Sequence, residues 1–202
     1  AERVLEALLE LFPNADLYTL LYGPESTNSN FQRHAIISSR MNWKFVRRHH
    51  RLFIPLMPTL AGMMRLKGDY DLVISDTAGY AKGIGGLHAQ GTKRPYHITY
   101  CHTPLRYAWE TKSYFSNPLF TTLFYPAFSY LRRWDYRAAQ IPHKVLVNSR
   151  YIQDKVRHYY GRESTVVYPP IREELFYHDP VIPQEDYFLA VGRLLPYKRF
   201  DL

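Results

Sequence analysis

Short apolar runs alternate with helix-like stretches along most of the chain, and this alternation constrains the fold more than any other feature. Asp71–Ser75, Tyr96–Cys101, His143–Val147 and Thr165–Tyr168 have the pattern of strands, and Gly, Pro or Ser marks each change of pattern. Strands joined by helices pair in parallel, because the helix returns the chain to the same edge of the sheet. The sequence therefore predicts an α/β fold, a parallel sheet with helices on both faces.

The spacing of apolar and turn residues also predicts the other elements and a domain boundary. We expect helices at Ala1–Leu11, Thr77–Ala89, Leu105–Ala139 and Ser149–Tyr160, and strands at Leu17–Tyr22, His34–Ser38 and Tyr187–Val191. Pro169 and Pro170 end the strand before them, and the polar stretch that follows is typical of a linker. One domain is expected over residues 1–168, with a linker and the start of a second domain over residues 169–202.

The charge and cysteine content restrict the partners. Lys and Arg number 26 against 18 Asp and Glu, which gives a net charge of +8 and favours nucleic acid, anionic lipid or phosphorylated substrates. The single cysteine, Cys101, excludes an internal disulfide framework and suits a cytoplasmic protein. Ser113–Leu131 carries no charge, but Pro118 and Pro126 favour an amphipathic or buried helix over a membrane span.

Polar side chains follow four of the predicted strands, at the sheet edge where α/β proteins bind their ligands. These are Ser75-Asp76, His102-Thr103-Pro104, Asn148-Ser149 and Gly192-Arg193. Helix capping is the alternative role for Asp76 and Ser149, since both residue types are common N-caps. We expect the imidazole of His102 to point into the crevice, with a buried, hydrogen-bonded histidine as the alternative.

Two groups of positively charged residues are suited to bind phosphate. Arg106 and Tyr107 lie on the first turn of a predicted helix, where backbone N–H groups also bind anions, although Arg106 is equally typical of a solvated surface charge. Arg193 and Lys198 follow a predicted strand and could neutralise a diphosphate, with ordinary loop charges as the alternative.

The segment from Trp43 to Ile54 mixes bulky apolar side chains with a dense run of positive charge. Anionic membrane surfaces attract this mixture, and a solvated charged face is the alternative. The membrane-surface candidates are Trp43, Lys44, Arg47, Arg48 and Arg51. The sequence contains no P-loop, G-x-G-x-x-G, H-E-x-x-H or nucleophile elbow, and its scattered histidines predict no metal site.

Five segments, in order along nearly the whole chain, resemble family 4 of the retaining glycosyltransferases. They are AERVLEAL at Ala1, SDTAGYAKGI at Ser75, YCHTPLRYAWE at Tyr100, VNSRYIQDKVRHYYGRESTVVYPPI at Val147 and VGRLLPYKRFDL at Val191. The CHTPLRYAW and YPPI segments are most similar to the mannosyltransferases that build polysaccharides on lipid carriers.

The resemblance implies the two-domain GT-B architecture, with a Rossmann-like N-terminal domain that holds the acceptor and a C-terminal domain that holds the nucleotide sugar. By this resemblance His102 would face the transferred sugar or the acceptor hydroxyl, and Arg193 with Lys198 would stabilise the diphosphate leaving group. We expect Asp76, Arg106 and Tyr107 to contribute to acceptor binding. The implied donor is a nucleotide sugar, GDP-mannose in the similar branch, and the implied reaction uses no cofactor and no divalent metal.

The chain also departs from the family pattern. Family members place a strand and a Gly-Gly loop before the AERV helix and carry a Glu-x7-Glu element in the C-terminal domain, and this sequence contains neither. We therefore expect a fragment that lacks the first strand and is inactive alone, from a parent that acts on a lipid-linked saccharide at the cytoplasmic face of the membrane. The alternatives are a non-catalytic module that binds a membrane surface or nucleic acid, and a GT-B enzyme of another type, such as a sugar-nucleotide epimerase.

Overall fold

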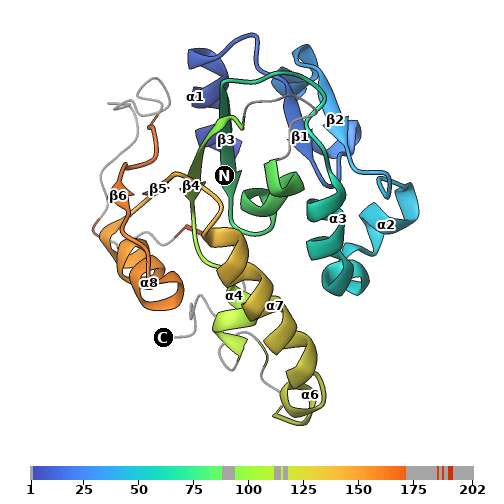
Figure 1. Cartoon of the computed structure of the whole chain (residues 1–202), viewed down its shortest axis with the longest axis vertical. Helices are drawn as coiled ribbons and strands as arrows, with labels where there is room; N and C mark the ends of the chain where they lie inside the picture. Colours follow the sequence, from blue (N-terminus) through green and yellow to red (C-terminus); the bar gives the residue numbers. More distant parts are fainter. Residues whose placement is uncertain are drawn as a thin grey trace.

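The computed structural model describes residues 2–87, 94–111, 115, 118–171, 186, 188, 191 and 192. The strands in these ranges form two parallel sheets (Figure 1). The smaller sheet pairs β1 (Leu17–Thr19) with β2 (Ile36–Ser38). The larger sheet has the order β3 (Leu72–Thr77), β4 (Tyr96–Cys101), β5 (Lys144–Val147) and β6 (Thr165–Val166). The prediction of a parallel α/β sheet is confirmed.

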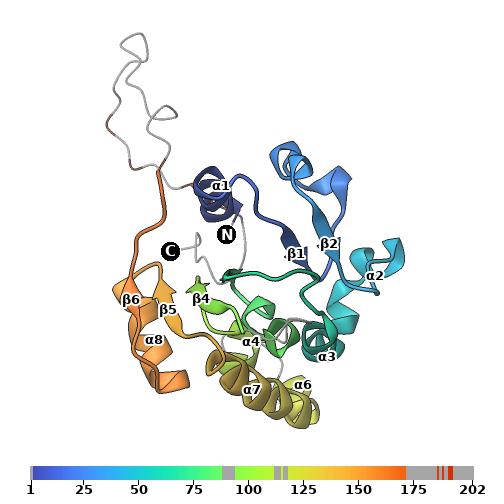
Figure 2. The same ribbon diagram turned by 45° about the horizontal axis from the view of Figure 1, so that its top comes forward.

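Helices lie on both faces of the larger sheet, as predicted. Figure 2 shows α1 (Glu2–Leu11) on one side of β4 and β5, and α7 (Tyr125–Ala139) and α8 (Arg150–Tyr160) on the other. The remaining helices are η1 (Pro24–Ser26), η2 (Ser29–Arg33), α2 (Lys44–Arg48), η3 (His50–Leu56), α3 (Met57–Met63), η4 (Ala81–Leu87), α4 (Arg106–Trp109) and α6 (Pro118–Leu123).

Helix α8 shows how local sequence fixes an element. The Ser149 hydroxyl accepts a hydrogen bond from the Ile152 N–H (3.3 Å), so Ser149 is an N-cap, and Gly161 ends the helix in the left-handed conformation. The buried residues Ile152, Val156 and Tyr160 recur every fourth position. They pack in one core cluster with residues of β4, β5 and α7, namely Cys101, Val145, Val147 and Ala139.

Two predicted helices were wrong in extent. The helix predicted over Thr77–Ala89 is a 3₁₀ helix from Ala81 to Leu87 in the described residues, because β3 continues to Thr77 and Gly85 adopts a left-handed φ of 61°. The helix predicted over Leu105–Ala139 is divided into α4, α6 and α7. Pro118 begins α6 and Pro126 lies in the first turn of α7, the helix position that tolerates proline.

A cavity of about 900 Å³ separates the two sheets. Consecutive residues of both β1 and β3 line it, together with apolar side chains of α1 such as Leu5 and Leu8, so each strand presents an edge to the cavity. Within the described ranges, β1 pairs only with β2, and β3 only with β4. A space bordered by two strand edges has the form that one more strand could fill.

The expected second domain is largely outside the described residues. The described chain after β6 runs to Ile171, and the linker expected up to residue 185, the strand expected at 187–191 and the loop that carries Arg193 and Lys198 are mostly or wholly beyond it. The boundary at residue 168 therefore stays a prediction.

Gly85 is a position where only glycine fits the backbone. An added Cβ would lie 2.2 Å from the carbonyl oxygen of Met64, and the φ of 61° disfavours any L side chain. We predict that Gly85→Ala lowers the free energy of unfolding, measured by urea denaturation, by at least about 2 kcal/mol.

Gly62 provides the matched control for Gly85. It lies in α3, and an added Cβ would meet no atom within 4 Å, so Gly62→Ala should raise stability by roughly 0.5 kcal/mol. Equal stability of the two variants would contradict the left-handed conformation of Gly85.

Candidate functional site

Three polar residues meet at the carboxyl edge of the larger sheet, where the sequence predicts a ligand site. Asp76 is the penultimate residue of β3, His102 follows β4 and Asn148 follows β5. The His102 N–H donates to the carbonyl of Thr77 (2.9 Å), which extends the strand pairing by one residue. The side chain of Asn148 donates to the carbonyl of His102 (3.2 Å), so three neighbouring strand ends are joined.

The side chains of Asp76 and His102 form a close pair. Nε2 of His102 lies 2.5 Å from a carboxylate oxygen of Asp76, and the two side chains are 13% and 9% exposed. Helix capping by Asp76 is not what the structure shows, because the N–H of Gly79 instead donates to the hydroxyl of Thr77. The imidazole is therefore held by a carboxylate at the sheet edge.

This arrangement determines which nitrogen of His102 is available. An ionised carboxylate accepts a proton donor, so the Nε2–H bond points to Asp76, and in the neutral imidazole Nδ1 then carries the lone pair. Among the described residues no group forms a hydrogen bond with Nδ1. The pair can thus present an oriented basic nitrogen to a hydroxyl group, and Asp76 also lines the cavity between the sheets.

Tyr100 supports the ring of His102 from the neighbouring position of β4. The two rings are 5.1 Å apart and nearly edge-on, at 64°. Burial, together with the negative charge of Asp76, raises the pKa of Tyr100. Its hydroxyl donates to the carbonyl of Val167 (2.7 Å), which ties the chain after β6 to the same region.

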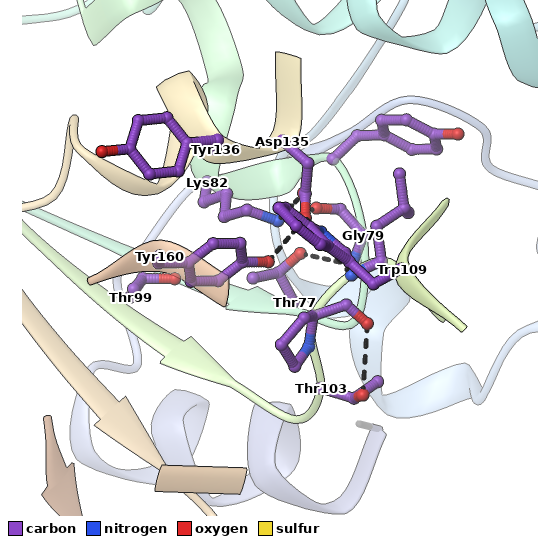
Figure 3. Close-up of polar contacts among 12 residues, drawn as sticks. Thr77, Gly79, Lys82, Thr99, Thr103, Trp109, Asp135, Tyr136 and Tyr160 are labelled. Atoms are coloured by element: carbon purple, nitrogen blue, oxygen red, sulfur yellow. Dashed lines mark hydrogen bonds and ion pairs between the residues drawn. The ribbon is translucent and has the colours of Figure 1, made fainter. Parts of the chain in front are cut away.

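A buried carboxylate, Asp135 of α7, lies behind the strand ends (Figure 3). Its side chain has no exposed surface and pairs with the equally buried ammonium of Lys82 at 2.5 Å. The Tyr160 hydroxyl (2.6 Å) and the Trp109 indole N–H (2.8 Å) donate to its other oxygen. Burial and the charge of Asp135 raise the pKa of Tyr160 well above its usual value, so this phenol remains a donor.

This network also fixes the two segments that follow the candidate pair. The Lys82 ammonium donates to the carbonyl of Gly79 (2.7 Å), three residues beyond Asp76. The N–H of Leu105, three residues beyond His102, points to Asp135 at 3.4 Å. The sequence analysis missed these residues, although Asp135 falls at helical spacing from the buried Phe128 and Leu131.

The structure places Arg106 and Tyr107 away from a helix-terminal anion site. Helix α4 has four residues, so the long helix that was expected to aim its N–H groups at a phosphate is absent from this position. Arg106 lies 3.4 Å from the carboxylate of Glu110, and the Tyr107 hydroxyl lies 2.6 Å from that of Tyr80. Their contribution to acceptor binding stays a prediction.

The basic aromatic segment forms an exposed surface, which we call the α2–η3 surface and define as Trp43, Lys44, Phe45, Arg48, Arg51 and Leu52. Trp43, Phe45 and Leu52 are 65%, 62% and 75% exposed. Arg47 differs from the other candidates, because its guanidinium contacts the carboxylate of Glu25 (3.3 Å) and the carbonyl of Asn42 (3.2 Å). None of the helices in the described ranges is both long and apolar enough to cross a bilayer.

Two further predictions concern groups beyond this edge. Arg193 and Lys198 lie outside the described residues, so the structure does not bring them together with His102. Throughout the described part of the chain, no three or more His, Cys, Asp or Glu side chains are grouped to hold a metal ion.

A second histidine, His97, is buried within the sheet. Its Nε2 lies 2.9 Å from the Ser75 hydroxyl, which in turn donates to the hydroxyl of Thr99 (2.9 Å). Burial lowers the pKa of His97 from 6.5 to about 4, with smaller electrostatic contributions from the neighbouring His143 and Arg94. His97 is therefore neutral in the folded protein at pH 7, a structural histidine rather than part of the edge site.

Comparison with known proteins gives one family. The model of the family described as Glycosyltransferase Family 4 matches residues 1–175. Neither the curated proteins nor the solved structures contain a match to the chain.

The Asp135–Lys82 ion pair generates a stability prediction. Asp135→Asn keeps the shape but leaves the Lys82 ammonium buried without a counter-charge, so we expect urea denaturation to show a loss of about 3–5 kcal/mol. Adding Lys82→Met removes that charge and should recover part of the loss. If the double variant lost as much stability as the two single variants together, the pair would not be coupled. The control is Glu163→Gln, which breaks the exposed Arg157–Glu163 pair and should have no measurable effect on stability.

The neutral state of His97 generates a pH prediction. The unfolded chain binds a proton near pH 6.5 and the folded chain only near pH 4, so stability falls as the pH drops between these values. This histidine alone should lower the free energy of unfolding by about 2 kcal/mol between pH 7 and pH 5. His97→Gln should flatten the dependence of the free energy of unfolding on pH, whereas His158→Gln, at an exposed histidine, should leave it unchanged. An unchanged dependence for His97→Gln with a flatter one for His158→Gln would exclude this assignment.

Proposed function

Because the chain belongs to glycosyltransferase family 4, we propose that it is the acceptor-side domain of a retaining hexosyltransferase that moves mannose from GDP-mannose to a lipid-linked saccharide. Family membership supplies the reaction class, a transfer of a sugar from a nucleotide sugar to an acceptor. The single observation that carries the assignment of the site is the Asp76–His102 pair at the carboxyl edge of the sheet.

His102 is proposed to contact the transferred sugar or the attacking hydroxyl through Nδ1, while Asp76 orients the ring through Nε2. An oriented imidazole can bind a sugar hydroxyl more strongly as charge develops in the transition state. The acceptor attacks on the face from which the diphosphate leaves, and a phosphate oxygen takes the hydroxyl proton, so the configuration is retained without a carboxylate nucleophile. Arg193 and Lys198 are proposed to stabilise the charge that grows on the diphosphate, with no divalent metal in the transfer.

The α2–η3 surface supports a lipid-linked acceptor. It presents exposed aromatic and basic side chains together on a chain of net charge +8. Each basic residue near an anionic leaflet gains about 1 kcal/mol, and Trp and Phe favour the membrane interface. We therefore propose peripheral binding at the cytoplasmic face of the membrane, where lipid-linked saccharides for cell-surface polysaccharides could be extended.

The experiment that tests this function uses the protein as its complete gene encodes it. Membranes that contain lipid-linked saccharides are mixed with a panel of labelled sugar nucleotides, and label in the lipid extract is measured. We expect transfer from GDP-mannose, and nuclear magnetic resonance should show the same anomeric configuration in donor and product. Absence of label with every donor would overturn the proposal, and label from a different donor would overturn its choice of mannose.

Substitutions at the pair test its role in the same assay. His102→Ala should lower kcat by about 10²–10³-fold, and Asp76→Asn, which leaves the ring less oriented, by about tenfold. His102→Gln can still donate to Asp76 but cannot present an imidazole Nδ1 to the substrate, so it should preserve the thermal midpoint and lose turnover. His158→Ala, at an exposed histidine, is the matched control. Turnover that falls only as far as stability falls would assign His102 a structural role.

A further inference from the structure

The end of the α6–α7 hairpin exposes a group of large apolar side chains, which we call the tip and define as Leu119, Leu123, Phe124 and Tyr125. Their exposed fractions are 81%, 75%, 43% and 60%. Helix α7 leads away from the sheet and places α6 at one end of the molecule (Figure 1). Exposed apolar side chains gathered at one place mark an interaction surface rather than an ordinary solvated face.

Helix α7 also has a buried face that packs on the protein core. On its other side, α7 buries Phe128, Leu131 and Ala138, and Leu131 packs in a cluster with Leu105 and Ala108 of the sheet-edge loop and α4. The helix is therefore already anchored by its inner face. The inner face of α7 thus packs on the core, while the tip keeps much of its apolar surface exposed.

Basic residues follow the apolar tip along α7, and an apolar group flanked by basic residues is typical of a segment that lies at a membrane interface. Arg132 and Arg133 lie seven and eight residues after Tyr125, a rise of about 10–12 Å along the helix. Tyrosine rings and arginines both favour the level of the lipid headgroups, so Tyr125 and Arg132 would lie there together, next to the inserted leucines. The guanidinium of Arg132 also lies 5.3 Å from the ring of Tyr125, a favourable arrangement at an interface of low polarity.

The charged residues in the sequence on either side of the tip are of one sign. Between Glu110 and Asp135 the sequence contains no acidic residue, and Asp135 itself is fully buried against Lys82. Nothing in this stretch of sequence would repel an anionic lipid headgroup, and the arginines would attract it.

We propose that the tip of the α6–α7 hairpin inserts into the interface of an anionic lipid bilayer, with Arg132 and Arg133 on the headgroups. This gives the protein a lipid contact in addition to the α2–η3 surface. The inference rests on the proposed membrane association but not on the proposed sugar transfer.

Three leucines of nearly equal exposure allow a matched test. Leu123 of the tip, Leu52 of the α2–η3 surface and Leu11 of α1 are 75%, 75% and 73% exposed. The protein encoded by the complete gene is sedimented with vesicles of equal parts phosphatidylglycerol and phosphatidylcholine, or of phosphatidylcholine alone. Each leucine is replaced by serine in turn, and circular dichroism checks that the variants fold.

We expect Leu123→Ser to weaken binding to the anionic vesicles about three- to tenfold, and the Leu119→Ser/Leu123→Ser pair to weaken it at least about tenfold. Arg132→Gln and Arg133→Gln should each weaken binding about fivefold, and only on the anionic vesicles. Leu11→Ser should leave binding within about twofold of the parent protein.

Several outcomes would overturn the inference. These are no binding to anionic vesicles, binding that Leu52→Ser weakens but the tip variants do not, and a tip that drives self-association without lipid while vesicle binding is absent. Tip-dependent vesicle binding by a protein that transfers no sugar would support the inference and overturn the proposed function.

Discussion

Burying a carboxylate is unfavourable unless it is paired and hydrogen-bonded, and three other parts of the chain pair and hydrogen-bond Asp135. Lys82 of η4 neutralises the charge, Trp109 of α4 and Tyr160 of α8 donate hydrogen bonds, and Asp135 itself belongs to α7. Moving any one of these elements would leave a charged or polar atom unpaired in an apolar surrounding. The network therefore fixes how the helices on this face of the sheet sit relative to one another.

The same network explains how the carboxyl edge of the sheet holds a defined shape although it consists of loops. Lys82 holds the carbonyl of Gly79 just after β3, and Asp135 lies against the N–H of Leu105 just after β4. The segments that follow Asp76 and His102 are thus both held by the residues of one ion pair. A side-chain pair 2.5 Å apart depends on such support, because small displacements of either loop would separate the carboxylate from the imidazole.

The sequence predicted best those elements that local patterns specify. The strand Tyr96–Cys101 has its predicted bounds, and α8 begins after the Ser149 cap and ends at Gly161. The two helices predicted wrongly in extent differ for local reasons: Gly85 adopts a left-handed φ within the 3₁₀ helix η4, and Pro118 and Pro126 stand at the starts of α6 and α7. The position of His102 after a strand was predictable, but its carboxylate partner was not, because pairing depends on strand register between β3 and β4. Lys82 and Asp135 were missed because charged residues are rarely expected to be buried.

Helix α7 buries a charged residue near one end and exposes an apolar one at the other, the opposite of what an amphipathic helix usually does. Near its end it buries the charged Asp135, whereas at its beginning, beside α6, it exposes Tyr125. A helix selected for stability alone would place apolar residues inside and charges outside. The buried charge orders the segments at the sheet edge, and the exposed apolar side chains lie toward the other end of the helix. Each departure from ordinary amphipathicity therefore coincides with a proposed role, the buried charge with the ordering of the candidate site and the exposed apolar surface with the proposed lipid contact.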